Sequence, residues 1–178
     1  MTCIFTIGHS TRDLAEFSRV LQAHEIRLLV DVRAFPASRR HPHFSREYLE
    51  LWLPEIGLDY VWEKDLGGMR KQQMPPDKSP NFALREDAFR NYADYMLSPA
   101  FQNTIDRLVE RSVKQRTAIM CAEYLYFRCH RMLVSDYLVS RGHQVLHIVD
   151  ENPPGEHRLT KEARIIEDRL VYRGDYLL

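Results

Sequence analysis

Two thiols, a carboxylate, an imidazole and a guanidinium occur within eleven residues in the middle of the chain. An apolar run ends in Cys121 and Glu123, and the triplet Cys129-His130-Arg131 follows it. The run predicts a buried strand, and the apolar spacing after the triplet predicts a helix that packs back on that strand. We therefore expect Cys129 and His130 in the first turns of the helix, facing the carboxyl end of the strand. These residue types predict a functional site at this turn.

Acid–base chemistry is the first interpretation of this cluster. Glu123 and His130 could transfer protons, and Arg131 could hold an oxyanion beside a helix N-terminus, which itself favours anions. A nucleophilic role for Cys121 is weaker, because a phosphatase-type loop needs an Arg where this chain has Phe127. Alternatively, the cluster has only a structural role, as a buried polar network in which Arg131 neutralises Glu123.

A metal site is the second chemical interpretation. Cys121, Cys129 and His130 offer the sulfur and nitrogen ligands that suit zinc or iron, with His9 or His147 to complete the set. The spacing matches no standard structural zinc pattern. Neighbouring residues of a helix point about 100° apart, so Cys129 and His130 are awkward ligands for one ion. The sequence therefore ranks acid–base chemistry above metal binding.

A basic segment follows the second predicted strand, from Arg33 to Arg46. Asp31 and Arg33 belong to an otherwise apolar strand, where a charged side chain is usually paired or functional. We expect Arg33 and Arg39 to bind a substrate anion. Aromatic residues alternate with the basic ones in this segment, which would suit a phosphate backbone with unstacked bases.

The turn Gly8-His9-Ser10 follows the first predicted strand. Ser10, with Asp13 three residues later, resembles a capping box for the next helix and is also expected to contact substrate. A turn does not require an imidazole, so His9 is expected to be catalytic or a metal ligand.

The composition excludes several classes of protein. The 178 residues are 44% hydrophobic, which is enough for one globular domain. Lys and Arg number 25, as do Asp and Glu, so no overall charge attracts nucleic acid or a membrane, and anion binding must be local. Three cysteines without a C-x-x-C pair indicate a reducing compartment. Because we find neither a signal peptide nor an apolar run of membrane length, we expect a cytoplasmic protein without a membrane partner.

Strands and helices are predicted in alternation. Strands are expected at residues 3–7, 27–33, 58–62, 117–123, 144–149 and 170–172. Helices are expected over residues 14–21, 46–56, 89–108 with a break at 98–99, after 129, and briefly at 157–160. Residues 64–81 lack periodicity, and a loop of this length predicts a mobile segment, either a functional lid or a disordered stretch. The order of elements predicts a single doubly wound α/β domain over residues 1–178, with a mostly parallel sheet and helices on both faces. In such folds ligands bind at the carboxyl ends of the strands.

Several ordered motifs give the chain a family resemblance. They are Thr6–Ser10, Asp31–Arg33 with Phe35-Pro36 and Ser38-Arg39, Leu66–Gly68, Tyr92–Met96, Met120–Glu123, Cys129–Arg131 and His147-Ile148. Together they resemble the family known as domain of unknown function 488, over about residues 4–172. Met69 departs from the pattern, in which we expect an Arg. The resemblance implies a prokaryotic α/β protein and supplies no substrate, so function must come from the site.

The sequence therefore predicts an enzyme that hydrolyses or modifies a phosphate-containing substrate, a nucleotide or nucleic acid, by acid–base catalysis. The expected catalytic residues are Glu123, His130, His9 and Cys121, and the expected substrate-binding residues are Arg33, Arg39, Arg131 and Ser10. Two alternatives stay open. One is a metal- or redox-responsive binding protein that uses zinc or iron, and the other is a nucleic-acid-binding accessory module without catalysis.

Overall fold

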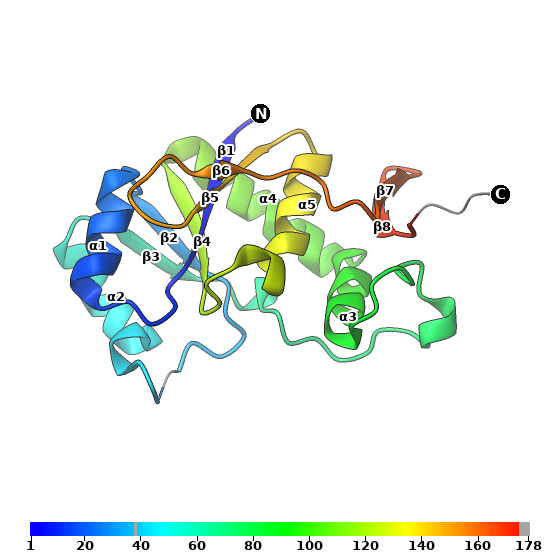
Figure 1. The fold of residues 1–178 in the computed structure, drawn as a ribbon, viewed down its shortest axis with the longest axis horizontal. Coiled ribbons are helices and arrows are strands. Elements are labelled where there is room, and N and C mark those ends of the chain that lie inside the picture. The colour runs from blue at the N-terminus through cyan, green and yellow to red at the C-terminus, as the bar shows by residue number, and fades with distance from the viewer. Residues whose placement is uncertain (38, 175–178) are drawn as a thin grey trace.

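A computed structural model describes residues 1–37 and 39–174, so Ser38 of one family motif lies outside the described residues. The main element is a six-stranded sheet in the order β3-β2-β4-β1-β5-β6 (Figure 1). Its strands are β1 (Cys3–Gly8), β2 (Leu28–Asp31), β3 (Asp59–Trp62), β4 (Thr117–Cys121), β5 (Gln144–Ile148) and β6 (Gly155–Glu156). The first five pair in parallel, and β6 runs antiparallel to β5. A separate antiparallel hairpin follows, made of β7 (Ala163–Ile166) and β8 (Arg169–Tyr172).

Helices cover both faces of the sheet. Those in the described residues are α1 (Leu14–Ala23), α2 (Arg46–Glu55), α3 (Asp87–Met96), α4 (Pro99–Lys114) and α5 (Arg131–Ser140). Helices α1 and α2 pack on one face, and α3, α4 and α5 pack on the other side (Figure 1). Short 3-10 helices are η1 (Pro42–Phe44), η2 (Lys64–Leu66), η3 (Pro76–Lys78) and η4 (Tyr126–Arg128). The arrangement confirms the predicted single-domain α/β fold. No helix among the described residues is long and apolar enough to span a membrane.

The apolar strands build two cores. Phe5, Ile7 and Leu29 pack with α1 and α2, whereas Ile4 and Leu28 pack with α3, α4 and α5. Successive side chains of a strand point to opposite faces, so a strand covered on both sides is apolar throughout. This is why the runs in β1 and β2 lack the alternation of a half-exposed strand.

The neighbouring strands β1 and β4 have connections that leave on opposite faces. Gly8 pairs with Cys121 at their carboxyl ends, and Asp31 of β2 pairs with Met120. The chain leaves β1 for α1 and leaves β4 for α5, which pack on different faces. Such divergence opens a crevice at the carboxyl edge of the sheet. Gly8 is required here, because an added Cβ would overlap the Glu123 carbonyl.

Two local predictions were wrong. Helix α1 is capped by Asp13, whose side chain accepts a hydrogen bond from the Glu16 N–H (2.7 Å), and not by Ser10. The φ of Ser10 is +50°, which belongs to a tight turn, whereas an N-cap has extended backbone. Residues 157–160 form no helix, because His157 and Thr160 bond instead to the buried Asp136.

The loop over residues 64–81 is held at both ends. The Tyr92 hydroxyl donates to the Leu66 carbonyl (2.8 Å). At the other end, Asp94 accepts hydrogen bonds from Ser79 and Asn81 (2.6 and 2.7 Å). Only the middle of the loop is left to move, and its mobility stays a prediction.

Candidate functional site at the carboxyl edge of the sheet

Cys121, Cys129 and His130 meet at the carboxyl end of β4. We call them the thiol cluster, and their ligand atoms all lie within 4.8 Å of one another. The Cys129 Sγ and the His130 Nδ1 are 3.4 Å apart. Two such atoms bound to one tetrahedral zinc ion would be about 3.6 Å apart, given bonds of about 2.3 and 2.05 Å. The thiol cluster therefore has the dimensions of a metal site.

The sequence-based objection to a metal at this place was wrong. Cys129 precedes α5, which begins at Arg131, and its backbone is extended (φ −136°, ψ 153°). His130 is the N-cap of α5 and already has helical backbone (φ −56°, ψ −14°). Because the conformation changes between these neighbours, their side chains are not separated as on a helix, and both reach one point.

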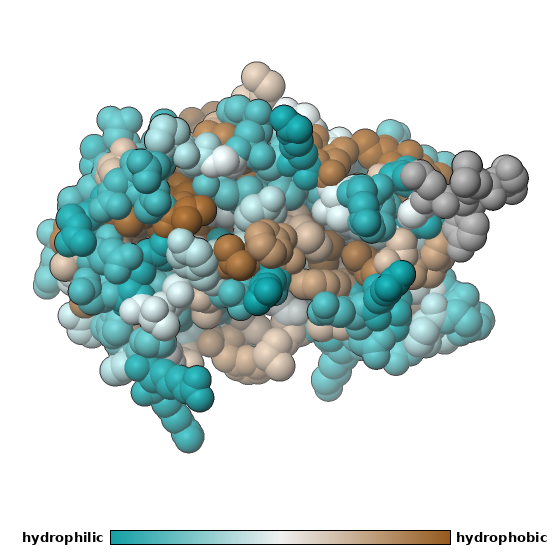
Figure 2. Space-filling model, in the orientation of Figure 1, coloured by the Kyte–Doolittle hydropathy of each residue, from teal (hydrophilic) through white to brown (hydrophobic). Residues whose placement is uncertain are grey.

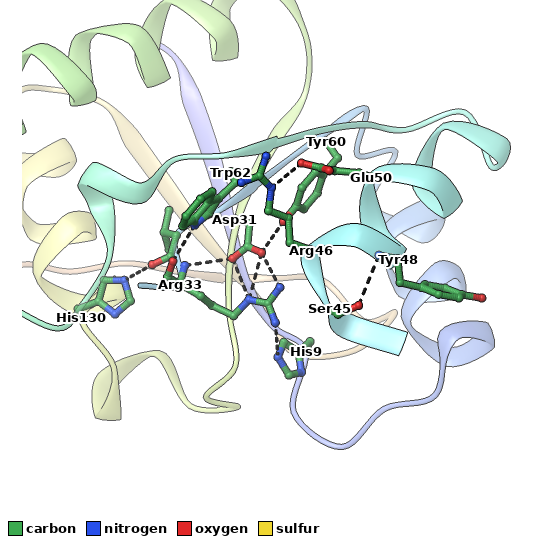
Figure 3. Close-up of polar contacts among 11 residues, drawn as sticks. His9, Asp31, Arg33, Ser45, Arg46, Tyr48, Glu50, Tyr60, Trp62 and His130 are labelled. Atoms are coloured by element: carbon green, nitrogen blue, oxygen red, sulfur yellow. Dashed lines mark hydrogen bonds and ion pairs between the residues drawn. The ribbon is translucent and has the colours of Figure 1, made fainter. Parts of the chain in front are cut away.

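The imidazole of His130 is held from two sides. Its Nε2 lies 2.9 Å from the Val32 carbonyl oxygen, which can only accept a hydrogen bond, so Nε2 carries the proton (Figure 3). In the neutral ring Nδ1 then has a free lone pair. Gly68 packs against this side of the ring, where an added Cβ would overlap Nδ1. A backbone carbonyl behind the distal nitrogen is typical of metal-bound histidines.

The two sulfurs of the cluster shift each other's pKa in opposite directions. The Cys121 thiol donates a hydrogen bond to the Cys129 sulfur, which lowers the pKa of Cys129 and raises the pKa of Cys121. The charge of Arg131 also lowers the pKa of Cys129, whereas burial raises it. Two groups so close titrate as a pair, and the thiolate is the form that binds metals.

An open cavity of about 370 Å³, the thiol cavity, adjoins the cluster. It is lined by Arg33, Ala34, Phe35, Gly68, Met69, Ala88, Phe89, Cys121, Ala122, Glu123, Arg128, Cys129 and His130. Glu123 is exposed and is the one acidic side chain among these lining residues. A molecule bound in this cavity would face the sulfurs, the imidazole and a carboxylate together.

A second cavity of about 470 Å³, the basic cavity, shares a wall with the first. It is lined by His9, Ser10, Thr11, Arg33, Phe35, Ala37, Arg39, Arg40, His41, Ala122, Glu123 and Tyr124. Arg39 and Arg40 are exposed and bring positive charge to this cavity. The structure thus places Ser10, Arg33 and Arg39 together, as expected for anion-binding residues.

Arg33 is fixed by a buried carboxylate. Its Nε and Nη2 donate to the two oxygens of Asp31 (2.9 and 2.5 Å), and Tyr60 donates to the Asp31 Oδ2 (2.6 Å; Figure 3). Asp31 is fully buried and Arg33 is 6% exposed. The carboxylate offsets most of the charge of Arg33, and the Nη1 atom points to His9 (3.3 Å).

His9 is a neutral acceptor in this arrangement. Its Nδ1 donates to the Ser10 carbonyl (2.9 Å), so its Nε2 accepts from Arg33. The ring stacks on Phe44 at 4.3 Å. Burial, followed by the charge of Arg33, lowers the pKa of His9 to about 4. His9 lines the basic cavity and is not in the thiol cluster, so it does not complete the expected metal site.

Arg131 holds the loop after β4 and does not reach a cavity. Its side chain is 1% exposed and donates to the carbonyls of Glu123 and Tyr124. It lines neither the thiol cavity nor the basic cavity. The expected role of Arg131 in binding a substrate anion is therefore replaced by a role in shaping the loop between Cys121 and Cys129.

A buried network behind this loop was not foreseen. His147 stacks on Tyr126 of η4 at 3.4 Å and bonds to His157 (2.8 Å), which donates to Asp136 (3.0 Å). Asp136 also accepts a hydrogen bond from Tyr172 (2.9 Å). These residues come from separate elements, so no sequence spacing connects them. The network ties the tail of the chain to the loop that carries the thiol cluster.

The fold and the site define an α/β protein with a thiol–imidazole cluster at the carboxyl edge of its sheet. A family model described as Domain of unknown function DUF488 matches residues 13–138. The chain belongs to this family, as the motifs predicted. The matched region runs from the cap of α1 into α5 and includes the whole thiol cluster. No curated protein and no solved structure matches the chain.

Proposed function

We propose that Cys121, Cys129 and His130 bind one soft divalent metal ion, zinc or ferrous iron, and that the chain is a metal-dependent hydrolase. The observation that carries this proposal is the group of three ligand atoms within 4.8 Å beside an open cavity. Catalytic zinc typically has three protein ligands and an open fourth position, whereas structural zinc is closed by four. Among the described residues, this group contains no fourth His, Cys, Asp or Glu.

A water molecule in the fourth position would face the thiol cavity. An ion held by Cys121, Cys129 and His130 would lower the pKa of bound water and so supply hydroxide near neutral pH. Glu123 lies on the same wall and accepts the proton. The oxygen of water would bond to the electrophilic atom of the substrate as the bond to the leaving group breaks, and Glu123 would return the proton to that group. In this scheme His130 and Cys121 are ligands and not proton carriers.

A phosphate-containing substrate fits the adjoining basic cavity. Arg39 and Arg40 supply exposed positive charge, since Asp31 offsets Arg33, and Ser10 adds a hydroxyl. The two cavities share a wall, so an anion in the basic cavity places the rest of the substrate beside the metal. This supports a nucleotide or nucleic acid as the substrate.

Hydrolysis assays on metal-free and metal-loaded protein test the proposal, with bis(p-nitrophenyl) phosphate, nucleotides and oligonucleotides as substrates. We expect turnover only with zinc or ferrous iron, and none in Cys129→Ser, because a hydroxyl is a poor substitute for thiolate. Glu123→Gln should keep the metal and lose about 10²–10⁴-fold in turnover. The matched control is Cys3→Ser, since Cys3 lies at the opposite end of β1 and should affect neither property.

Three results would overturn the proposal. Turnover without metal, or equal turnover in Cys129→Ser, would return the site to metal-free acid–base chemistry. Metal binding without any turnover would favour a metal-responsive binding protein instead.

A further inference from the structure

Three of the cavities that Phe35 helps to line adjoin one another. The third, which we call the outer cavity, has a volume of about 490 Å³. It is lined by Phe35, Gly68, Met69, Arg70, Lys71, Ala88 and Asn91. It shares Phe35, Gly68, Met69 and Ala88 with the thiol cavity. The thiol cavity, which shares a different wall with the basic cavity, therefore lies between the other two.

Positive charge lies at both ends of this row. Arg39 and Arg40 line the basic cavity, and Arg70 and Lys71 line the outer cavity. The described residues of all three walls include six Arg or Lys and one acidic residue, Glu123. The whole chain has 25 residues of each sign, so this excess is local. A ligand that satisfies both ends needs negative charges on either side of the thiol cavity.

The middle of the row is apolar and exposed. Phe35 and Met69 are 71% and 74% exposed, although both side chains are large and hydrophobic. Figure 2 shows hydrophobic side chains across the middle of the face drawn, between largely hydrophilic surfaces. An exposed aromatic ring flanked by basic groups is the arrangement on which bases of a single strand stack. In a duplex the bases are already stacked on one another, so this ring would find no partner.

We infer that the substrate of this site is a single-stranded nucleic acid that crosses all three cavities, with one base on Phe35 and phosphates at both basic ends. The inference deepens the proposed function, because it names the substrate of the same site. A mononucleotide carries its phosphate at one end only and can satisfy one basic group of residues. A strand places an internal nucleotide beside the thiol cluster and its neighbouring phosphates at Arg39 and Lys71.

Fluorescence anisotropy with a labelled ten-nucleotide single strand tests this inference. The strand should bind more tightly than its duplex and than the corresponding mononucleotides. Phe35→Ala should weaken strand binding by about 10–100-fold through lost stacking. Arg39→Ala and Lys71→Ala should each reduce the slope of log affinity against log salt by about 0.7, as expected for one phosphate contact on a single strand. The controls are Val113→Ala and Lys114→Ala, two exposed residues at the end of α4 next to the amino edge of the sheet, which should change nothing.

Equal affinity for strand and mononucleotide, an unchanged affinity in Phe35→Ala, or an unchanged salt slope in Lys71→Ala would overturn the inference. The same assay on Cys129→Ser separates this inference from the proposed function. If Cys129→Ser still binds the strand and the wild type shows no metal-dependent turnover, the hydrolase is refuted and the strand site stands. Metal-dependent turnover of mononucleotides, without tighter binding of a strand, would refute the strand site and leave the hydrolase standing.

Discussion

The Nε2 of His130 donates a hydrogen bond to the main-chain carbonyl of Val32, 2.9 Å away and 98 positions earlier in the sequence. This bond joins the residue after β2 to the residue before α5 and turns Nδ1 toward the sulfurs of Cys121 and Cys129. The carbonyl belongs to the backbone and cannot be removed by a substitution. The orientation of the ring can instead be disturbed from the other side, where it meets Gly68.

Gly68→Ala should lower the affinity for zinc by about 10–100-fold, which is the usual cost of disturbing the shell behind a metal ligand. The added methyl group would overlap the His130 Nδ1 and displace the imidazole. Gly155→Ala is the control, since an added Cβ there meets nothing within 4 Å. Competition with a chromophoric chelator measures both affinities. Equal zinc affinity in the two variants would show that Nδ1 is not a ligand.

Arg131→Ala should lower the free energy of unfolding more than it lowers the affinity for any ligand. The substitution leaves the carbonyls of Glu123 and Tyr124 without their donor, at a cost of about 1–3 kcal/mol for each buried one. Arg128→Ala, an exposed position on the same loop, should stay within about 0.5 kcal/mol of the wild type. Urea denaturation gives both free energies of unfolding. Wild-type stability in Arg131→Ala, combined with weaker anion binding, would restore the sequence-based role of this residue.

The free energy of unfolding should fall as the pH drops from 7 to 5. Burial, with the nearby charges of His157 and Arg131, lowers the pKa of His147 to about 3, whereas an unfolded histidine has a pKa of about 6.5. Between these values the unfolded chain binds a proton that the folded chain excludes, so acidification favours unfolding. His147→Gln, which can still bond to Thr6 and His157, should reduce this loss by about 1–2 kcal/mol at pH 5. Urea denaturation of both proteins at pH 7 and pH 5 measures this loss. The same pH dependence in His147→Gln and the wild type would mean that His147 already titrates normally in the folded protein.

The sheet and its carboxyl edge were predictable because short continuous apolar runs, alternating with longer helical patterns, favour buried parallel strands. The runs in β2 and β4 fixed the places of Arg33, Cys121 and Glu123, since parallel strands end at one edge. The family motifs pointed to the same residues, and the family model confirms the membership.

The conformation of single residues was not predictable from these patterns. Whether Cys129 and His130 can share a ligand depends on one change of backbone between them, which no spacing reveals. The guanidinium of Arg131 is a chemical group that commonly binds anions, and only its contacts show that it instead donates to two main-chain carbonyls. Of the β7–β8 hairpin, only β8 was predicted. The strand β7 was missed because it is short and two of its side chains, Ile165 and Ile166, are exposed, so it has no buried apolar run.

X-ray absorption spectroscopy on protein loaded with one equivalent of zinc tests the central claim most directly. The chain must carry no histidine tag, so that the only strong site is its own. We predict two sulfur neighbours at about 2.3 Å, with nitrogen and oxygen neighbours at about 2.0–2.1 Å, and the loss of one sulfur in Cys129→Ser. A zinc environment of oxygen and nitrogen alone, or one that is unchanged in Cys129→Ser, would contradict a metal centre built on Cys121, Cys129 and His130.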